Sequence, residues 1–327
     1  MKKRFSILFS ASFPLNNKHI QTLYAPLFRK QAIPKVEIET FELADGDFVE
    51  CYWHKEKPKD ERPIVILFHG LAGSFYSPYI LGIMKALDKK GFNAVLMHFR
   101  GCSGKENRLA RSYHSGDTGD AKAWIEHVHT NYPKATLYAI GYSIGGNMLL
   151  KLLGEEKNTT ALKAAISISA PLDLKVTAEV INQGFSRRYQ SHLLKPLNAS
   201  LSKKFQQFKM SKYIRLKEEE IENIKTIEDF DDVYTAPMHG FKSADDYYSK
   251  CSAKQYLKDI TIPTLIIHAK DDPFMDERIV PTEEERSSFV SLELSSHGGH
   301  VGFVSGSLFK PRYWLEERIV EYLSQLS

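Results

Sequence analysis

A short run of glycines around one serine constrains this 327-residue chain more than any other feature. An apolar, β-leaning run (137–140) leads into GYSIGG (141–146), and an apolar helical pattern follows. We expect a strand, a tight turn and a helix, with Ser143 at the apex of the turn. Gly141 and Gly145 suit this turn because the strand and the helix approach each other closely there, and larger side chains would collide.

Short apolar runs alternate with helical patterns on both sides of this turn. The strand-like runs are apolar throughout, which is typical of strands buried on both faces of a parallel sheet. The alternation predicts an α/β fold with a mostly parallel central sheet and helices on both faces. Further strands are expected at 64–68, 94–99, 164–170, 264–268 and 290–294, and helices at 78–89, 117–130 and 311–326.

The first 35 residues are expected to form an amino-terminal arm. Residues 17–31 mix aromatic and basic side chains without clean periodicity, so they are expected to be an irregular strap packed on the core. The start of the chain superficially resembles a secretory signal. It lacks a small-residue cleavage site, and Pro14 follows directly, so we do not expect a cleaved leader. The β-rich runs between 36 and 54 predict a hairpin.

The alternation of strands and helices stops after Pro171. Residues 175–262 are helix-like and charged, and they predict a helical cap inserted into a core formed by residues 1–174 and 263–327. A solvated helical face explains the basic residues of this insertion, and attraction to a membrane surface is the alternative. The basic residues between 187 and 217 are Arg187, Arg188, Lys195, Lys203, Lys204, Lys209, Lys212, Arg215 and Lys217.

Composition excludes several classes of protein. A net charge of +4 is too small to indicate a nucleic-acid partner. Three scattered cysteines (Cys51, Cys102, Cys251) predict neither a disulfide framework nor a zinc site. There is no G-x-G-x-x-G nucleotide fingerprint and no apolar run long enough to span a membrane. We therefore expect a cytoplasmic protein without cofactors. The alternative is a peripheral position at the inner membrane, and the oligomeric state is left open.

The chain supplies partners that could activate Ser143. Acyl transfer by a serine needs a base that takes the hydroxyl proton and an acid that orients that base. Asp272 follows one predicted buried strand, and His300 lies in a glycine-flanked loop after the next. The chain order Ser, Asp, His is that of the α/β-hydrolase fold. We therefore predict a triad of Ser143, Asp272 and His300.

Neighbouring residues offer alternatives to this triad. Asp271 competes with Asp272, and His297 competes with His300, although the glycines before His300 favour it. These histidines and aspartates lack the close spacing of a metal site, so no metal is expected. Cys102 follows a strand but is expected to be an inert thiol.

Two backbone amides are expected to stabilise negative charge beside Ser143. The Ile144 amide begins the helix after the serine, where free N–H groups and the helix dipole favour an anion. The loop HGLAG (69–73) follows a buried strand and lets the backbone approach a ligand, so the Leu71 amide is the expected second donor. His69 is expected to brace this loop without taking part in chemistry.

Several longer motifs resemble the YheT-like branch of the α/β-hydrolases. The resemblance extends from the amino-terminal arm to the carboxyl-terminal loop, and it implies a carboxylic-ester hydrolase with eukaryotic relatives that act on acyl esters and phospholipids. Asp272 stands three residues after Ala269, which is the usual offset of the acid in α/β-hydrolases. The motifs are HIQTLYAPLFRK (19–30), HGLAGS (69–74), MHFRGCSG (97–104), YHSGDT (113–118), GYSIGGNM (141–148), FDD (230–232), DYYSKCSA (246–253), IIHAKDDPFM (266–275) and HGGHVGF (297–303).

The leading hypothesis is a serine esterase that cleaves small-molecule or lipid-like esters of short to medium acyl chains. A membrane-surface lipase and a non-catalytic binding module on the same fold are the alternatives. Apolar side chains beside the triad are expected to line an acyl pocket: Tyr142, Phe274, Met275, Val301 and Phe303.

Overall fold

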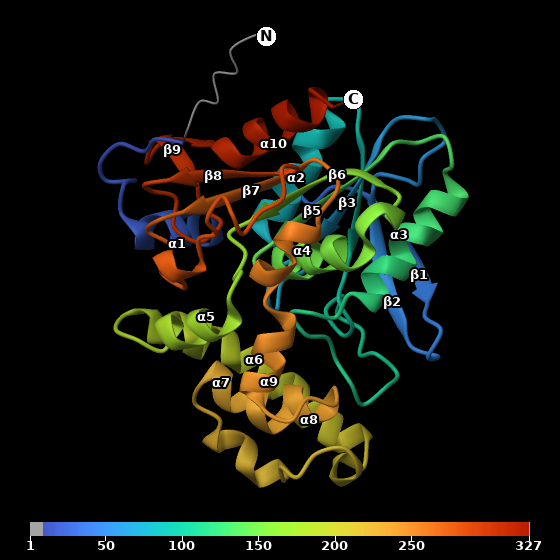
Figure 1. The fold of residues 1–327 in the computed structure, drawn as a ribbon, viewed down its shortest axis with the longest axis vertical. Coiled ribbons are helices and arrows are strands. Elements are labelled where there is room, and N and C mark those ends of the chain that lie inside the picture. The colour runs from blue at the N-terminus through green and yellow to red at the C-terminus, as the bar shows by residue number, and fades with distance from the viewer. Residues whose placement is uncertain (1–8, 327) are drawn as a thin grey trace.

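The centre of the structure, a computed structural model that describes residues 9–326, is an eight-stranded sheet (Figure 1). Its strand order is β1-β2-β4-β3-β5-β6-β7-β8. The first two pairings are antiparallel, and all pairings from β4 to β8 are parallel, which confirms the predicted α/β fold. The strands are β1 (Val36–Glu42), β2 (Phe48–His54), β3 (Ile64–Phe68), β4 (Asn93–Met97), β5 (Leu137–Tyr142), β6 (Leu162–Ile168), β7 (Thr264–Ala269) and β8 (Val290–Ser295).

Helices cover both faces of the sheet. Alternate residues of a strand point to opposite faces, so β3 sends Ile66 into one apolar core and Leu67 into the other. The first core includes side chains of α3 and α4, and the second includes side chains of α2 and α10. The uniformly apolar sequence of β3 follows from this double burial. These helices are α2 (Pro78–Asp88), α3 (Gly119–Asn131), α4 (Ile144–Glu156) and α10 (Trp314–Ser324).

A separate group of helices, here called the helical layer, lies between β6 and β7 in the chain and below the sheet in Figure 1. It has an apolar cluster of its own, with Leu201, Met210 and Phe230 among the buried residues. Its main elements are α5 (Leu174–Ile181), α6 (Ser186–Gln207), α7 (Ile227–Phe230), a π-helical turn η4 (Asp231–Thr235), α8 (Ala236–Met238) and α9 (Ala244–Cys251). The described residues also contain short 3-10 turns: η1 (Lys157–Thr159), η2 (Met210–Lys212), η3 (Glu218–Asn223), η5 (Ala253–Asp259) and η6 (Glu277–Ile279).

One lysine of the helical layer departs from the expected solvated face. Lys204 is 1% exposed, and its ammonium donates to Asn107 Oδ1 at 2.5 Å and to the Leu109 carbonyl at 2.7 Å. Burial lowers the pKa of Lys204. This side chain therefore attaches α6 to the loop after β4, and it does not contribute to a basic surface.

The expectation of an irregular arm at residues 17–31 is wrong. The segment contains α1 (Lys18–Phe28), which begins at Asn17, whose side chain accepts hydrogen bonds from the His19 and Ile20 amides. Such an N-cap satisfies amides that otherwise lack a partner at the start of a helix. The leader-like start lies mostly in residues 1–8, outside the described part of the chain.

The final helix also begins later than expected. Pro311 lies in a small hairpin formed by β9 (Val304–Ser307) and β10 (Lys310–Tyr313), and α10 begins only at Trp314. Gly306 of β9 pairs with Pro311 and has a φ of 82°, a conformation that glycine adopts readily. Of the helices in residues 9–326, none is long and apolar enough to cross a membrane.

A buried arginine connects the loop after β4, the start of α3 and the turn between β1 and β2. Arg100, 3% exposed, makes two hydrogen bonds of 2.7 Å to Asp120 at the start of α3. Its Nη1 also donates to Asp45 and Asp47, at 2.7 and 3.0 Å, in the turn between β1 and β2. Arg100 is the cation that these three carboxylates share, so its removal leaves the buried Asp47 carboxylate without an ion-pair partner.

Replacement of Arg100 by methionine tests this network. Arg100→Met is expected to lower the free energy of unfolding by about 3–5 kcal/mol because the carboxylate of Asp47 loses its buried cation. Arg108→Met removes an exposed pair with Glu42 and is the matched control, with an expected loss of about 0–1 kcal/mol. Urea unfolding measures both values, and equal losses for the two variants would contradict the assignment.

Candidate active site

The turn between β5 and α4 presents Ser143 in a strained backbone conformation. Its φ is 52° and its ψ is −124°, a region that residues with a side chain rarely adopt. A methyl group at Gly141 would collide with the backbone of Gly145, and one at Gly145 would collide with the backbone carbonyl of His69. The two glycines therefore permit the close approach of strand and helix that the sequence predicts.

The structure brings together the three residues of the predicted triad. His300 Nε2 lies 3.0 Å from Ser143 Oγ, and His300 Nδ1 lies 2.8 Å from Asp272 Oδ2. The Asp272 side chain is fully buried and also accepts the Phe274 amide at 2.9 Å. A carboxylate in this position holds the imidazole with Nδ1 protonated and leaves Nε2 free to accept the serine proton.

The structure places Asp271 and His297, the alternatives to Asp272 and His300, in different positions from the triad residues. Asp271 does not contact His300: its carboxylate accepts the Gly299 amide at 2.9 Å and lies 3.3 Å from His297 Nδ1. The imidazole of His297 is 42% exposed. Asp271 and His297 thus support the loop that carries His300, whereas Asp272 and His300 face the serine.

Helix α1 supports the His300 loop, a role that was not predicted. The Thr22 hydroxyl donates to the Lys18 carbonyl and accepts the His300 amide at 3.0 Å. Gln21 pairs with the backbone of Val304 through both ends of its amide, at 2.7 and 2.8 Å. The available sequence signal was Asn17 as an N-cap, followed by apolar residues at helical spacing.

The two amides predicted to face an anion belong to this site. The amides on either side of Leu71 are occupied, since Gly70 donates to the Tyr79 hydroxyl and Ala72 to the Tyr113 hydroxyl, both at 3.0 Å. Within the described residues, the structure gives the Leu71 and Ile144 amides no acceptor. Two free donors next to the serine suit a developing oxyanion.

His69 braces the loop after β3, as expected. Its Nε2 accepts the Phe99 amide at 3.1 Å, so Nδ1 carries the proton and donates to the Gly70 carbonyl at 2.7 Å. Burial lowers the pKa of His69 to about 3, which keeps the ring neutral at physiological pH. Burial also raises the pKa of the Cys102 thiol to about 12, consistent with an unreactive thiol.

A cavity of about 580 Å³ lies beside the triad. Of the residues predicted to line an acyl pocket, Phe274, Met275 and Val301 do so, and the Phe274 ring stacks on His300 with centroids 4.1 Å apart. Helix α1 and the helical layer supply much of the remaining wall. Lining side chains from these elements include Leu23, Pro26, Leu174, Ala178, Ile181, Leu193, Leu197, Ile227 and Phe230.

Two predicted lining residues lie elsewhere. Tyr142 is 1% exposed and packs against Tyr79, because alternation along β5 directs it into the core behind the turn. Phe303 is fully buried and stacks on Trp314 of α10. The interpretation of Tyr142 and Phe303 as pocket residues is therefore wrong, and both support the turn and the loop from within.

One group of side chains has the spacing of metal ligands. His114, Asp117 and His239 offer ligand atoms within 4.8 Å of one another, and none of the three belongs to the predicted triad. The carboxylate of Asp117 is paired with Arg111, whose positive charge opposes a cation there. We therefore interpret these three side chains as structural residues.

Comparisons with known proteins agree with this architecture. The family described as alpha/beta hydrolase fold matches residues 63–307. The chain is 43% identical to "Putative esterase YheT" of Escherichia coli (strain K12), over 94% of this chain and 91% of that protein. It is 30% identical to "Phospholipase ABHD3" of Bos taurus, over 88% of this chain and 71% of that protein.

Solved structures show the same fold. The Pyrococcus furiosus esterase PF2001 superposes with a TM-score of 0.59 at 17% identity and covers 89% of this chain and 91% of its own. At such low identity the likeness concerns the fold alone. The family match and the relative from Escherichia coli show that this chain belongs to the α/β-hydrolase fold family, in its YheT-like branch.

Proposed function

We propose that this protein is a serine hydrolase that cleaves carboxylic esters through Ser143, His300 and Asp272. The observation that carries the proposal is the continuous hydrogen-bonded chain from the Ser143 hydroxyl through the His300 imidazole to the buried Asp272 carboxylate. The esterase named among the relatives supports carboxylic esters as the substrate class.

Attack on the ester begins at the serine. His300 Nε2 takes the hydroxyl proton while Ser143 Oγ bonds to the carbonyl carbon, and Asp272 stabilises the imidazolium that forms. The electron pair of the carbonyl moves to its oxygen, which becomes an oxyanion. The Leu71 and Ile144 amides donate to that oxyanion, and the loss of one such donor costs about 2.7–4 kcal/mol in comparable sites.

The intermediate then releases the alcohol. His300 gives its proton to the leaving oxygen as the carbonyl re-forms, which leaves an acyl group on Ser143. A water molecule then loses a proton to the same nitrogen and attacks the acyl carbon. As the bond between the acyl carbon and Ser143 Oγ breaks, His300 returns that proton to Oγ and the carboxylic acid departs. The stacked Phe274 ring limits movement of His300 during this exchange of protons.

Replacement of the serine tests the proposed chemistry. Ser143→Ala is expected to lower kcat on p-nitrophenyl butyrate and octanoate by at least about 1,000-fold because no acyl-enzyme can form. Labelling by a fluorophosphonate probe should disappear in the same variant. Ser169→Ala, which removes a hydroxyl that accepts the Val301 amide, is the control and should keep the label. Equal rates for wild type and Ser143→Ala would contradict the proposal.

The Thr22 hydroxyl provides a separate test of how His300 is positioned. Thr22→Val removes the acceptor of the His300 amide and is expected to lower kcat about three- to tenfold, the effect of one hydrogen bond, with KM nearly unchanged. Thr22→Ser keeps the acceptor and should retain most of the activity. Steady-state kinetics on one ester distinguish the variants, and equal losses for valine and serine would exclude this role.

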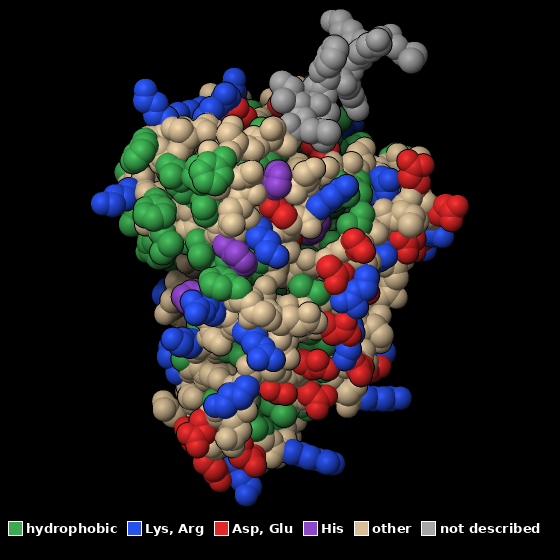
Figure 2. All heavy atoms as spheres, turned by 90° about the vertical axis from the view of Figure 1, so that its left-hand side faces the viewer, with side chains coloured by type: hydrophobic (Ala, Val, Ile, Leu, Met, Phe, Trp, Pro, Cys, Tyr) green, Lys and Arg blue, Asp and Glu red, His purple; other side chains and the backbone are tan. Residues whose placement is uncertain are grey.

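A membrane-surface phospholipase is the second candidate, and a particular surface favours it. Exposed apolar side chains gather around the end of α1 and the turn between β9 and β10, and Figure 2 shows apolar groups beside basic ones on this side of the molecule. Helix α1 also lines the cavity, so this surface adjoins the site. We call it the α1 face; its apolar residues are Leu27, Phe28, Ile33, Leu308 and Phe309.

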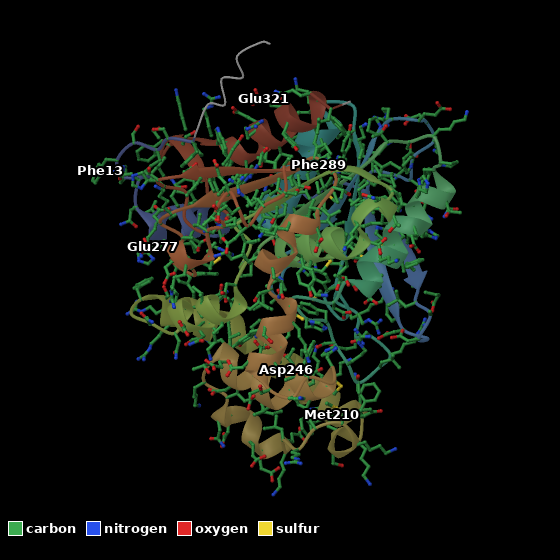
Figure 3. The ribbon with its side chains drawn as sticks, in the orientation of Figure 1. Phe13, Met210, Asp246, Glu277, Phe289 and Glu321 are labelled. Atoms are coloured by element: carbon green, nitrogen blue, oxygen red, sulfur yellow. The ribbon has the colours of Figure 1, made fainter. Side chains whose placement is uncertain are left out.

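Vesicle binding tests the α1 face. The protein is expected to cosediment with phosphatidylcholine vesicles that contain phosphatidylserine, and binding should decrease as salt rises. Phe309→Ser should weaken binding because this side chain is 94% exposed. Phe289→Ser is the matched control: this exposed ring precedes β8, and Figure 3 shows it well away from Phe13, which lies in the chain just before α1. Absence of binding at low salt would rule out this candidate.

A further inference from the structure

The cavity beside the triad has one wall in the sheet core and another in the helical layer. Ser143 and His300 line it from the carboxyl ends of the strands. Asp231, Thr235 and Tyr248 line it from the helical layer. A substrate whose ester group lies at Ser143 and whose remainder fills the cavity would therefore contact both walls.

Asp231 is a polar residue in an otherwise largely apolar wall. It begins the π-helical turn after α7, is 9% exposed, and accepts the Tyr248 hydroxyl at 2.8 Å. Thr235 supplies a second side-chain hydroxyl. π-helical turns insert a residue into a helix and occur frequently at functional sites. Here the turn carries a carboxyl group to the cavity wall.

Within residues 9–326, no ion pair compensates the charge of this carboxyl group. Glu228, an acid whose charge acts on Asp231, is already paired with Lys175. Burial raises the pKa of Asp231 to about 7, and Glu228 acts in the same direction. The phenols of Tyr247 and Tyr248 also face it from α9. A carboxylate accepts about four hydrogen bonds, so two hydroxyls leave capacity unused.

We propose that Asp231, held by Tyr248, is a recognition site for a hydrogen-bond donor, a hydroxyl or an ammonium group, at the end of the substrate remote from the ester. This inference rests on the proposed esterase function. It makes the cavity selective for esters with a polar far end. A plain alkyl end would leave the buried carboxyl group without the partner that a donor provides, and sites of this kind discriminate strongly against the analogue that lacks the donor.

The test compares paired esters. Each pair consists of p-nitrophenyl esters with acyl chains of equal length, six to twelve carbons, one plain and one with a terminal hydroxyl or amino group. A second series carries the terminal group on the alcohol side. In at least one series, the ratio of kcat/KM for the substituted ester to that for the plain ester should fall at least about tenfold in Asp231→Leu.

Two further variants separate recognition from a structural role. Asp231→Asn keeps an acceptor but no charge, so it should retain the preference for a hydroxyl and lose the preference for an amine. Asp245→Asn removes an exposed carboxylate of α9 that pairs with Lys175 and should leave both ratios unchanged. If Asp231→Leu changes plain and substituted esters by the same factor in both series, Asp231 is structural and the inference fails.

A binding measurement keeps the test independent of hydrolysis. 1,8-Octanediol or 8-amino-1-octanol should raise the Tm of the wild type more than 1-octanol does, and Asp231→Leu should abolish the difference. Absence of any difference in the wild type would overturn the inference even if esters are hydrolysed. Absence of hydrolysis with the difference retained would instead contradict the proposed chemistry and leave Asp231 as a binding residue.

Discussion

The parallel direction of β3, β5, β7 and β8 within one sheet is the constraint on which the site depends. Parallel strands all end at the same edge, so the loops after them meet there although they lie far apart in the sequence. The loop after β3 brings the Leu71 amide, that after β5 brings Ser143, that after β7 brings Asp272 and that after β8 brings His300. The buried apolar strands thus determine where the residues of the proposed site lie, although no strand side chain takes part in the proposed reaction.

The loop after β8 needs more than the sheet. It contains Val301 and Phe303 at positive φ, a costly conformation for residues with a side chain. The loop amides donate hydrogen bonds to Thr22 of α1 and to Asp271, and the Phe303 ring stacks on Trp314; these contacts hold the backbone in place. The amino-terminal helix therefore supports the loop of the proposed triad as well as the cavity wall.

The sequence predicts those features that depend on local pattern. Apolar strands, the glycine turn at Ser143 and the order of Ser143, Asp272 and His300 all have signals within a few residues of themselves. The roles of Thr22 and Lys204 depend on partners 278 and 97 residues away, which no local periodicity encodes. Tyr142 and Phe303 were misplaced because adjacency to a site residue does not determine which way a side chain points.

The two buried carboxyl groups of the cavity region differ in how their charge is balanced. Asp272 receives a backbone amide and faces an imidazole that becomes positive when it takes a proton, so its charge is compensated within the protein. Asp231 receives hydroxyls, and within the described part of the chain no ion pair compensates its charge. A buried charge without a partner is costly to the folded chain. A hydrogen-bond donor on the substrate offsets this desolvation cost when it binds to the Asp231 carboxylate. The burial of Asp231 therefore favours the binding of substrates that carry such a donor.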